Sequence, residues 1–297
     1  MNRGPSIVTM DADDREETQR VFLAPDGTEI AYREFLARAV VRDDDHDRAP
    51  RPPLVILHGL AGSSREFVPT ARALAPHRVV LVDQRGHGRS TRVPTDVSRE
   101  AFVADVIGVI EHVVGGPVVL VGQSMGGHTA LLVAAARPDL VRALLLLEAG
   151  VGGDGDEGRR AELRAFFASW PVPFSDRAAA TAFLGDGPLE RAWVDDLEAS
   201  HDGLRPRFDA DVMVDVIAAV DERPRWETLP RLTMPHLLVF GERGMFEAAQ
   251  QFDLLQRAPD VRSVGLLGAG HDAHLDTPDV WFDVLRGFVT SVEPQSD

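Results

Sequence analysis

The chain has 297 residues, of which 44% are hydrophobic and 26% are charged, a balance typical of folded globular proteins. Its 31 basic and 47 acidic residues give a formal net charge of −16, which disfavours binding to nucleic acids or to anionic membranes. Cysteine is absent and all 31 basic residues are arginine, so thiolate metal sites, cysteine nucleophiles and lysine Schiff bases are excluded.

The N-terminal region is predicted to contain a tail, a hairpin and a loop. Residues 1–19 are polar and acidic, which predicts a flexible tail, and they lack the apolar segment of a signal peptide, so we expect a cytoplasmic protein. Apolar segments at residues 21–23 and 30–35 flank the turn sequence Pro25-Asp26-Gly27 and predict a β-hairpin. Residues 38–53 carry an Asp/His run, which favours a solvated loop over a metal site.

An alternation of apolar strands and helices begins at residue 54. Strands that are apolar on both faces are typical of a parallel sheet covered by helices on both sides. Helical patterns at residues 98–113 and 125–136 separate several of these strands. The alternation predicts an α/β fold with a doubly wound, mostly parallel sheet. The expected strands lie at residues 54–57, 79–82, 118–121, 143–147, 237–240 and 264–267.

The alternation stops between residues 150 and 235, where no apolar strand run occurs. Three of the four tryptophans fall in this segment, which indicates that it has a core or an apolar surface of its own. We therefore predict a helical cap at residues 151–234, inserted between the core segments 20–150 and 235–297. The expected cap helices lie at residues 157–169, 189–199 and 209–220, and a last core helix lies at residues 277–292.

The motif with the clearest chemistry is Gly-Gln-Ser-Met-Gly-Gly at residues 122–127, which follows an apolar strand and opens a helix. A strand that reverses into a helix at one strained residue needs small neighbours, and the turn exposes the Ser124 hydroxyl at the helix N-terminus. The helix dipole and the free N–H groups there stabilise developing negative charge. This context favours a nucleophilic serine over an idle serine at a glycine-rich helix start.

Four motifs in order resemble those of the α/β-hydrolase superfamily over roughly residues 20–292. Besides the serine motif, these are His58-Gly59, the segment Asp-Gln-Arg-Gly-His-Gly-Arg-Ser at residues 83–90, and Gly270-His271-Asp272. The resemblance implies an α/β-hydrolase fold with an inserted cap, and Ser124 as the nucleophile. It also implies that the loop after His58-Gly59 contributes to an oxyanion hole.

His271 is the best candidate for the base that activates Ser124. It lies on the loop between the last strand and the last helix, at the edge where the carboxyl ends of parallel strands meet. His274 is the alternative base. A metal pair made of His271 and His274 is disfavoured, because no third ligand is in view.

An oxyanion hole needs two convergent N–H donors. Met125 follows the nucleophile and supplies one, and Leu60 follows His58-Gly59 and supplies the other. His58 and Gly59 are also expected at the substrate, with His58 orienting the loop through hydrogen bonds.

The acid of the triad departs from the family pattern, because Gly244 stands where the family usually has the Asp of Gly-x-x-Asp. Glu148, at the end of the strand at residues 143–147, is preferred, since it keeps the order Ser, acid, His, and some family members are similar in carrying their acid there. Glu242, two residues before the vacant position, and Asp272, next to His271, are alternatives. The absence of a conventional acid is a further one.

Two other features have competing structural explanations. Gly-Val-Gly-Gly-Asp-Gly at residues 150–155 matches the dinucleotide pattern, but its place at the start of the cap favours a hinge. Aromatic residues of the cap are candidates for lining an apolar substrate pocket, although residues of this kind more often form a core for the cap itself. These residues are Phe166, Phe167, Trp170, Phe174, Trp193 and Trp226.

The sequence predicts a serine hydrolase that cleaves an ester, thioester or lactone of a small apolar molecule through an acyl-enzyme, with no cofactor and no metal. Hydrolysis of a C–C bond, a lyase reaction or acyl transfer on the same fold is the alternative. A ligand-binding member that lost its acid is a third possibility, for which Gly244 is the supporting feature.

Overall fold

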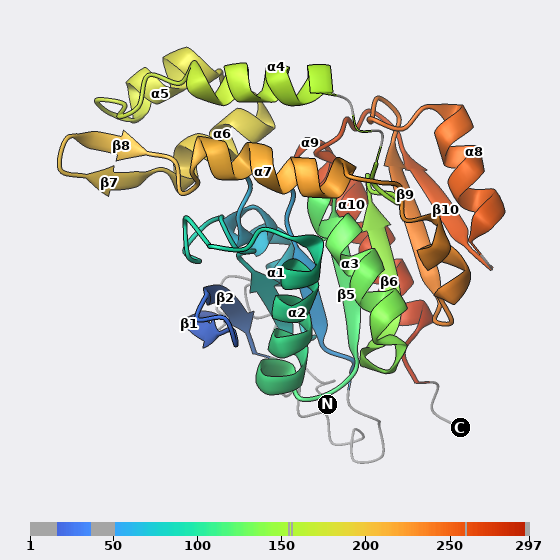
Figure 1. Cartoon of the computed structure of the whole chain (residues 1–297). Helices are drawn as coiled ribbons and strands as arrows, with labels where there is room; N and C mark the ends of the chain where they lie inside the picture. Colours follow the sequence, from blue (N-terminus) through green and yellow to red (C-terminus); the bar gives the residue numbers. More distant parts are fainter. Residues whose placement is uncertain (1–16, 37–50, 154, 156, 259, 295–297) are drawn as a thin grey trace, which may run out of the picture.

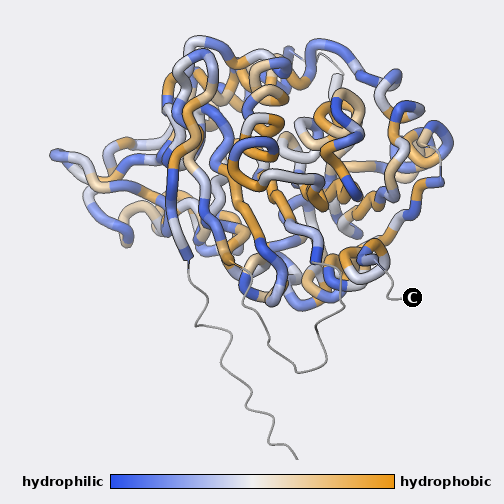
Figure 2. Tube along the Cα trace, turned by 90° about the horizontal axis from the view of Figure 1, so that it is seen from below, coloured by the Kyte–Doolittle hydropathy of each residue, from blue (hydrophilic) through white to orange (hydrophobic). Residues whose placement is uncertain are grey.

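The computed structural model describes residues 17–36, 51–153, 155, 157–258 and 260–294. A central sheet is flanked by helices on both sides, and a group of helices covers one end of the sheet (Figure 1). Hydrophobic segments concentrate in the sheet and on the helix faces that pack against it, with hydrophilic segments outside (Figure 2). The Asp/His run at residues 43–47 and most of the predicted tail lie outside the described residues.

The sheet confirms the predicted α/β class. Its strand order is β1-β2-β4-β3-β5-β6-β9-β10. The first two strands and the β2/β4 pair are antiparallel, and all other neighbours are parallel. The bounds are β1 Glu17–Leu23, β2 Glu29–Phe35, β3 Leu54–Leu57, β4 Val79–Val82, β5 Val118–Gln123, β6 Val141–Leu147, β9 His236–Gly241 and β10 Arg262–Leu266.

The predicted hairpin is present as β1 and β2, with Val21 opposite Ala31. Its first strand begins at Glu17, so the last residues of the range predicted as tail belong to the sheet. This difference arises because residues 17–20 pair with β2 through backbone hydrogen bonds, which need no apolar side chains.

Helices cover both faces of the sheet. On one face α2 (Arg99–Val109), α3 (Met125–Ala136) and α8 (Ala248–Arg257) contribute to one hydrophobic core. On the other face α1 (Val68–Ala73), α9 (Ala273–Asp276) and α10 (Pro278–Ser291) contribute to a second core. Eleven of the twelve residues of α3 are buried, so this helix is held rigidly against the sheet.

Between β6 and β9, the described residues form four α-helices, a small hairpin and a 3-10 helix at Trp226–Arg231. Their aromatic side chains form a third hydrophobic cluster, in which Trp170 lies 5.6 Å from Phe208 and 6.2 Å from Phe174 between ring centroids. Helix α5 and the hairpin were not predicted from the sequence. The bounds are α4 Glu157–Ala168, α5 Arg177–Leu184, α6 Pro188–Asp196, β7 Glu198–Ser200, β8 Gly203–Arg205 and α7 Ala210–Asp221.

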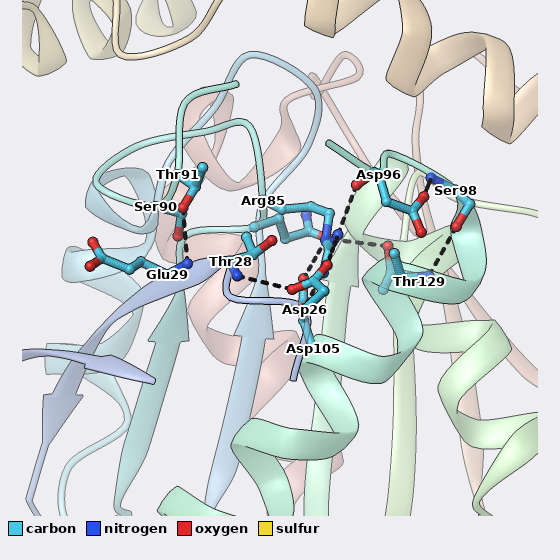
Figure 3. Close-up of polar contacts among 12 residues, drawn as sticks. Asp26, Thr28, Glu29, Arg85, Ser90, Thr91, Asp96, Ser98, Asp105 and Thr129 are labelled. Atoms are coloured by element: carbon cyan, nitrogen blue, oxygen red, sulfur yellow. Dashed lines mark hydrogen bonds and ion pairs between the residues drawn. The ribbon is translucent and has the colours of Figure 1, made fainter. Parts of the chain in front are cut away.

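A buried arginine ties the N-terminal hairpin to the sheet and to α2 (Figure 3). Arg85 is 2% exposed and donates to both carboxylate oxygens of Asp105, at 2.6 and 2.7 Å. It also donates to the Asp26 carboxylate at 3.0 Å and to the Asp96 carbonyl at 2.7 Å. The segment at residues 83–90 therefore has a structural role, since one guanidinium joins the hairpin turn, α2 and the loop before it.

We expect Asp105→Ala to lower the free energy of unfolding by about 3–5 kcal/mol, because it removes one member of a buried ion pair. Urea titration measures this difference. The matched control is Asp283→Ala, which breaks the exposed pair with Arg286 at 3.2 Å. An exposed pair contributes less than about 1 kcal/mol. Equal losses in the two variants would contradict the role assigned to Arg85.

Candidate active site

Ser124 lies in the turn between β5 and α3 with φ 52° and ψ −122°. A positive φ is strained for a residue with a side chain, so the surroundings must hold it in place. A Cβ on Gly122 would lie 2.6 Å from the Gly127 Cα, and one on Gly126 would lie 2.5 Å from the Leu57 oxygen. The glycines therefore allow α3 to begin directly against β3 and β5, with Ser124 at the tip of the turn.

His271 lies on the loop between β10 and α9, and its Nε2 is 2.9 Å from the Ser124 Oγ. The Gln123 Nε2 donates to the His271 carbonyl and to the Asp272 carboxylate, both at 3.3 Å. Gln123 thus fixes the histidine loop beside the serine turn. This role of Gln123 was not predicted from the sequence, although its position directly before Ser124 places it in the same turn.

Glu148 follows β6, is fully buried, and has φ 48°. Its Oε2 lies 3.3 Å from the His271 Nδ1. The backbone N–H groups of Gly241 and Met245 donate to Oε1 and Oε2 at 2.7 Å each. The carboxylate is therefore held from both sides, and it continues the chain of contacts from Ser124 through His271.

Gly244 leaves the space that the Glu148 carboxylate occupies beside His271. A Cβ on this residue would lie 2.5 Å from the Glu148 Oε2 and closer still to Oε1. The carboxylate of Glu148 thus fills the space that a side chain at position 244 would need. The missing Asp at this position is matched by an acid that reaches the same place from the neighbouring strand.

The two alternative acids make other contacts. Glu242 is exposed and accepts a hydrogen bond from the Gly268 N–H at 2.8 Å. Asp272 accepts from Gln123, and burial raises the pKa of its carboxyl group. Neither carboxylate makes a hydrogen bond to His271 among the described residues.

The alternative base, His274, lies away from Ser124. It is buried, stacks on Phe67 with 4.2 Å between ring centroids, and lies 3.6 Å from the Glu66 Oε2. Burial lowers the pKa of His274 to about 4. It is a neutral ring packed on Phe67, and it makes no hydrogen bond to Ser124 among the described residues. Within the ranges described, no group of three or more His, Cys, Asp or Glu residues is arranged to hold a metal ion.

The predicted oxyanion donors lie together. Leu60 and Met125 both line the cavity that contains Ser124, and no acceptor for either backbone N–H is present among the described residues. Gly59 also lines the cavity, and a Cβ there would lie 3.3 Å from the Ser124 Cβ.

His58, expected at the substrate, does not line the cavity. Its Nδ1 lies 2.7 Å from the Gly59 carbonyl, and the Gln84 N–H donates to its Nε2 at 3.0 Å. Burial lowers the pKa of His58 to about 4, so the ring is neutral and donates from Nδ1. The substrate-binding assignment of His58 is corrected accordingly, whereas its hydrogen bonds agree with the predicted role in orienting the loop that contains Leu60.

A cavity of about 620 Å³ opens beside Ser124. Core residues of the serine turn, the end of β6 and the loop after β9 form one side, and α4 and α7 form the other. Its walls are largely apolar, and most of these residues were not predicted from the sequence. The apolar lining comprises Leu60, Met125, Ala149, Val151, Leu163, Leu189, Ile217, Val220, Trp226, Met245, Phe246 and Leu254.

Of the six cap aromatics considered for the substrate pocket, Trp226 lines the cavity and the other five do not. Phe167 and Trp170 belong to the core of the cap, Trp193 packs against that core, and Phe166 is 42% exposed on its surface. The prediction that these five line the pocket is corrected, because their rings pack against one another: the ring centroids of Trp170 and Trp193 lie 5.4 Å apart.

Gly152 and Gly153 of the glycine-rich motif pack closely against the end of α7 and the residues after it. A Cβ on Gly152 would lie 2.5 Å from the Val220 carbonyl oxygen, and one on Gly153 would lie 2.7 Å from the Pro224 Cα. Both glycines have positive φ and both line the cavity. Their conformation and close packing account for the motif.

Comparisons with known proteins identify the family of the chain. The model of the alpha/beta hydrolase family matches residues 54–284. The mouse sn-1-specific diacylglycerol lipase ABHD11 is 29% identical over 260 residues, which are 81% of this chain and 82% of that protein. The Escherichia coli esterase YbfF is 27% identical over 257 residues, 85% of this chain and 97% of that protein.

Among solved structures, that of E-2-(acetamidomethylene)succinate hydrolase has a TM-score of 0.78 and 23% identity, covering 93% of this chain and all (100%) of that one. This likeness supports the fold. No helix in the described part of the chain is long and apolar enough to cross a membrane. From the matching family model and the hydrolases among its relatives, we conclude that the chain belongs to the alpha/beta hydrolase family and is a hydrolase.

Proposed function

We propose that this hydrolase cleaves an ester of a small, largely apolar molecule through a covalent acyl-enzyme. The observation that carries the proposal is the continuous chain from the Ser124 Oγ through His271 to Glu148, with distances of 2.9 and 3.3 Å, at the wall of the apolar cavity. The cavity volume of about 620 Å³ suits a small molecule. Curated relatives named as esterases and lipases support an ester over a C–C bond as the target.

The proposed first step is attack of the Ser124 oxygen on the ester carbonyl. A serine hydroxyl is a weak nucleophile unless a base removes its proton. The His271 Nε2 lies at hydrogen-bond distance from Oγ and accepts this proton. The C–O bond to the leaving alcohol then breaks as His271 returns the proton to it, and water attacks the acyl-enzyme by the same route.

Glu148 acts through His271 as a positioning residue. Its Oε2 lies next to Nδ1, so it favours the tautomer with the proton on Nδ1 and leaves Nε2 free to accept. It also stabilises the imidazolium that forms when Ser124 is deprotonated. The N–H groups of Gly241 and Met245 hold its carboxylate in that position.

The tetrahedral intermediate carries a negative oxygen that needs convergent donors. The backbone N–H groups of Leu60 and Met125 are proposed to supply them, supported by the dipole of the buried helix α3. Removing one such donor typically costs about 3–4 kcal/mol of transition-state stabilisation.

A ligand-binding member without catalysis is not favoured. The feature that supported it was the missing acid at Gly244, and the Glu148 carboxylate fills this place. Thioesters and lactones would follow the same steps, because each offers a carbonyl with a departing heteroatom.

We expect a fluorophosphonate probe to label the wild-type chain at Ser124, because His271 makes this hydroxyl nucleophilic. Ser124→Ala removes the oxygen and should abolish both the labelling and the hydrolysis of p-nitrophenyl butyrate. Mass spectrometry of the labelled peptide identifies the site. A folded wild-type chain that remains unlabelled would argue strongly against the proposed mechanism.

Glu148→Gln should reduce kcat by about three to four orders of magnitude, as expected when the base is held in the wrong tautomer. The matched control is Glu242→Gln, which changes an exposed carboxylate on a nearby loop and should leave kcat within about twofold. Steady-state kinetics on the same ester separates them. An unchanged rate in Glu148→Gln would remove Glu148 from the mechanism.

Gly244→Ala should also lower kcat, by at least about a hundredfold, because the new Cβ displaces the Glu148 carboxylate from His271. Gly287→Ala is the control, since a Cβ there meets no atom within 4 Å. Circular dichroism verifies that both variants fold. Full activity in Gly244→Ala would show that the acid is not confined as described.

A further inference from the structure

A second polar group lies in the cavity wall one helical turn beyond the nucleophile. His128 belongs to α3, and its backbone N–H donates to the Ser124 carbonyl at 3.0 Å. Ser124 and His128 both line the cavity. They therefore lie on the same side of the helix, separated by about 6 Å along its axis at 1.5 Å per residue.

The imidazole of His128 is 2% exposed, and neither ring nitrogen has a hydrogen-bond partner of normal geometry in the part of the chain that the structure describes. The nearby Val151 carbonyl does not reach that geometry. Burial and the positive charges of Arg99 and Arg225 lower the pKa of His128 to about 3, so the ring is neutral. A neutral imidazole has one N–H donor and one acceptor nitrogen, and buried groups of this kind are normally satisfied.

The charges around His128 favour an electron-rich partner. Arg99 is 1% exposed, its Nη2 donates to the Thr129 hydroxyl, and its Nε and Nη1 have no hydrogen-bond partner among the described residues. Glu100 is the carboxylate that favours the charged form of Arg99. It also lies 3.5 Å from Arg225, so it is shared between the two arginines.

Other charged groups in the cavity wall are mixed in sign. Arg159 and Arg160 approach from α4, while Asp221 and Asp253 approach from α7 and α8. The charged side chains that act most on His128 are Arg99 and Arg225, and their positive charge favours an oxygen that carries negative charge or a strong dipole.

We infer that the substrate carries a second electron-rich oxygen, of a carbonyl or carboxylate, which accepts a hydrogen bond from the His128 ring. With carbon–carbon bonds of about 1.5 Å, the separation from Ser124 corresponds to a chain of roughly four or five bonds from the scissile carbonyl. The substrate class is thus an ester with a second oxygen function at the far end of a short acyl chain. This inference rests on the proposed ester hydrolysis at Ser124, and it makes His128 a specificity-determining residue.

The test compares three p-nitrophenyl esters with acyl chains of similar length. p-Nitrophenyl heptanoate has an apolar end, methyl p-nitrophenyl adipate has a neutral carbonyl end, and mono-p-nitrophenyl adipate has a carboxylate end. We expect kcat/KM for at least one of the adipates to exceed that for the heptanoate by roughly tenfold or more. Preference for the neutral or the charged adipate identifies which oxygen is recognised.

His128→Leu should remove this preference while leaving kcat/KM for the heptanoate within about threefold, because the triad is untouched. His128→Gln keeps a donor of similar reach and should retain part of the preference. His201→Leu, on the exposed turn between β7 and β8, is the control and should behave as the wild type. Equal rates for all three esters in the wild type, or an equal loss on all three in His128→Leu, would overturn the inference, since solvent would then be the partner of His128.

A binding measurement separates this inference from the proposed function. Calorimetry on Ser124→Ala compares monomethyl adipate and dimethyl adipate with methyl heptanoate, and repeats the comparison in Ser124→Ala/His128→Leu. Tighter binding of an adipate that depends on His128 supports the second oxygen site whatever the rates are. Turnover of the heptanoate without any adipate preference contradicts the inference alone, whereas absence of both labelling and turnover contradicts the proposed function.

Discussion

The constraint on which the site depends is the reversal of β5 into α3 at a single residue. Ser124 can keep a positive φ only because its glycine neighbours let the helix begin against the backbone of β3 and β5. The same turn places the Met125 N–H at the start of a buried helix and brings Gln123 to the histidine loop. The proposed nucleophile, the proposed oxyanion donor and the loop of the proposed base are therefore positioned together, and a larger residue in this turn would displace all three.

The position of the acid follows from the order of the strands. β6 and β9 are parallel neighbours, with Leu147 opposite Val239, so the residues that follow them reach the same region. A carboxylate can then approach His271 from either strand, provided that the other strand leaves room. Glu148 uses its longer side chain and a positive φ to reach across, and Gly244 leaves that room. The two positions depend on each other, because Glu148 can reach His271 only if residue 244 has no side chain.

Local patterns in the sequence were sufficient to predict the sheet, helix α3 and the residues that follow the strand ends. Parallel strands collect their following loops at one edge, so Ser124, Glu148 and His271 could be placed near one another without coordinates. The roles of residues in the predicted cap were harder to predict from the sequence. An aromatic residue such as Trp170 packs equally well into a cap core or a pocket, and only the tertiary arrangement decides. The position of His58 also differs from the prediction because of tertiary contacts. Its hydrogen bonds to Gly59 and Gln84 hold the ring away from the cavity.

The division of the cavity between sheet and cap explains where specificity resides. Leu163 and Ile217 come from cap helices α4 and α7, and surfaces of this kind select by apolar fit, which discriminates weakly between chains of similar size. His128 is different, because it stands on the same buried helix as the nucleophile and cannot shift relative to it. A polar group on a rigid element selects substrates by the distance between their two oxygen functions. If the second oxygen is misplaced or missing, the polar group is left without a hydrogen-bond partner. In the proposed function, the predicted cap therefore provides the apolar surroundings, while the core helix that carries Ser124 also sets how far the second oxygen lies from the reacting carbonyl.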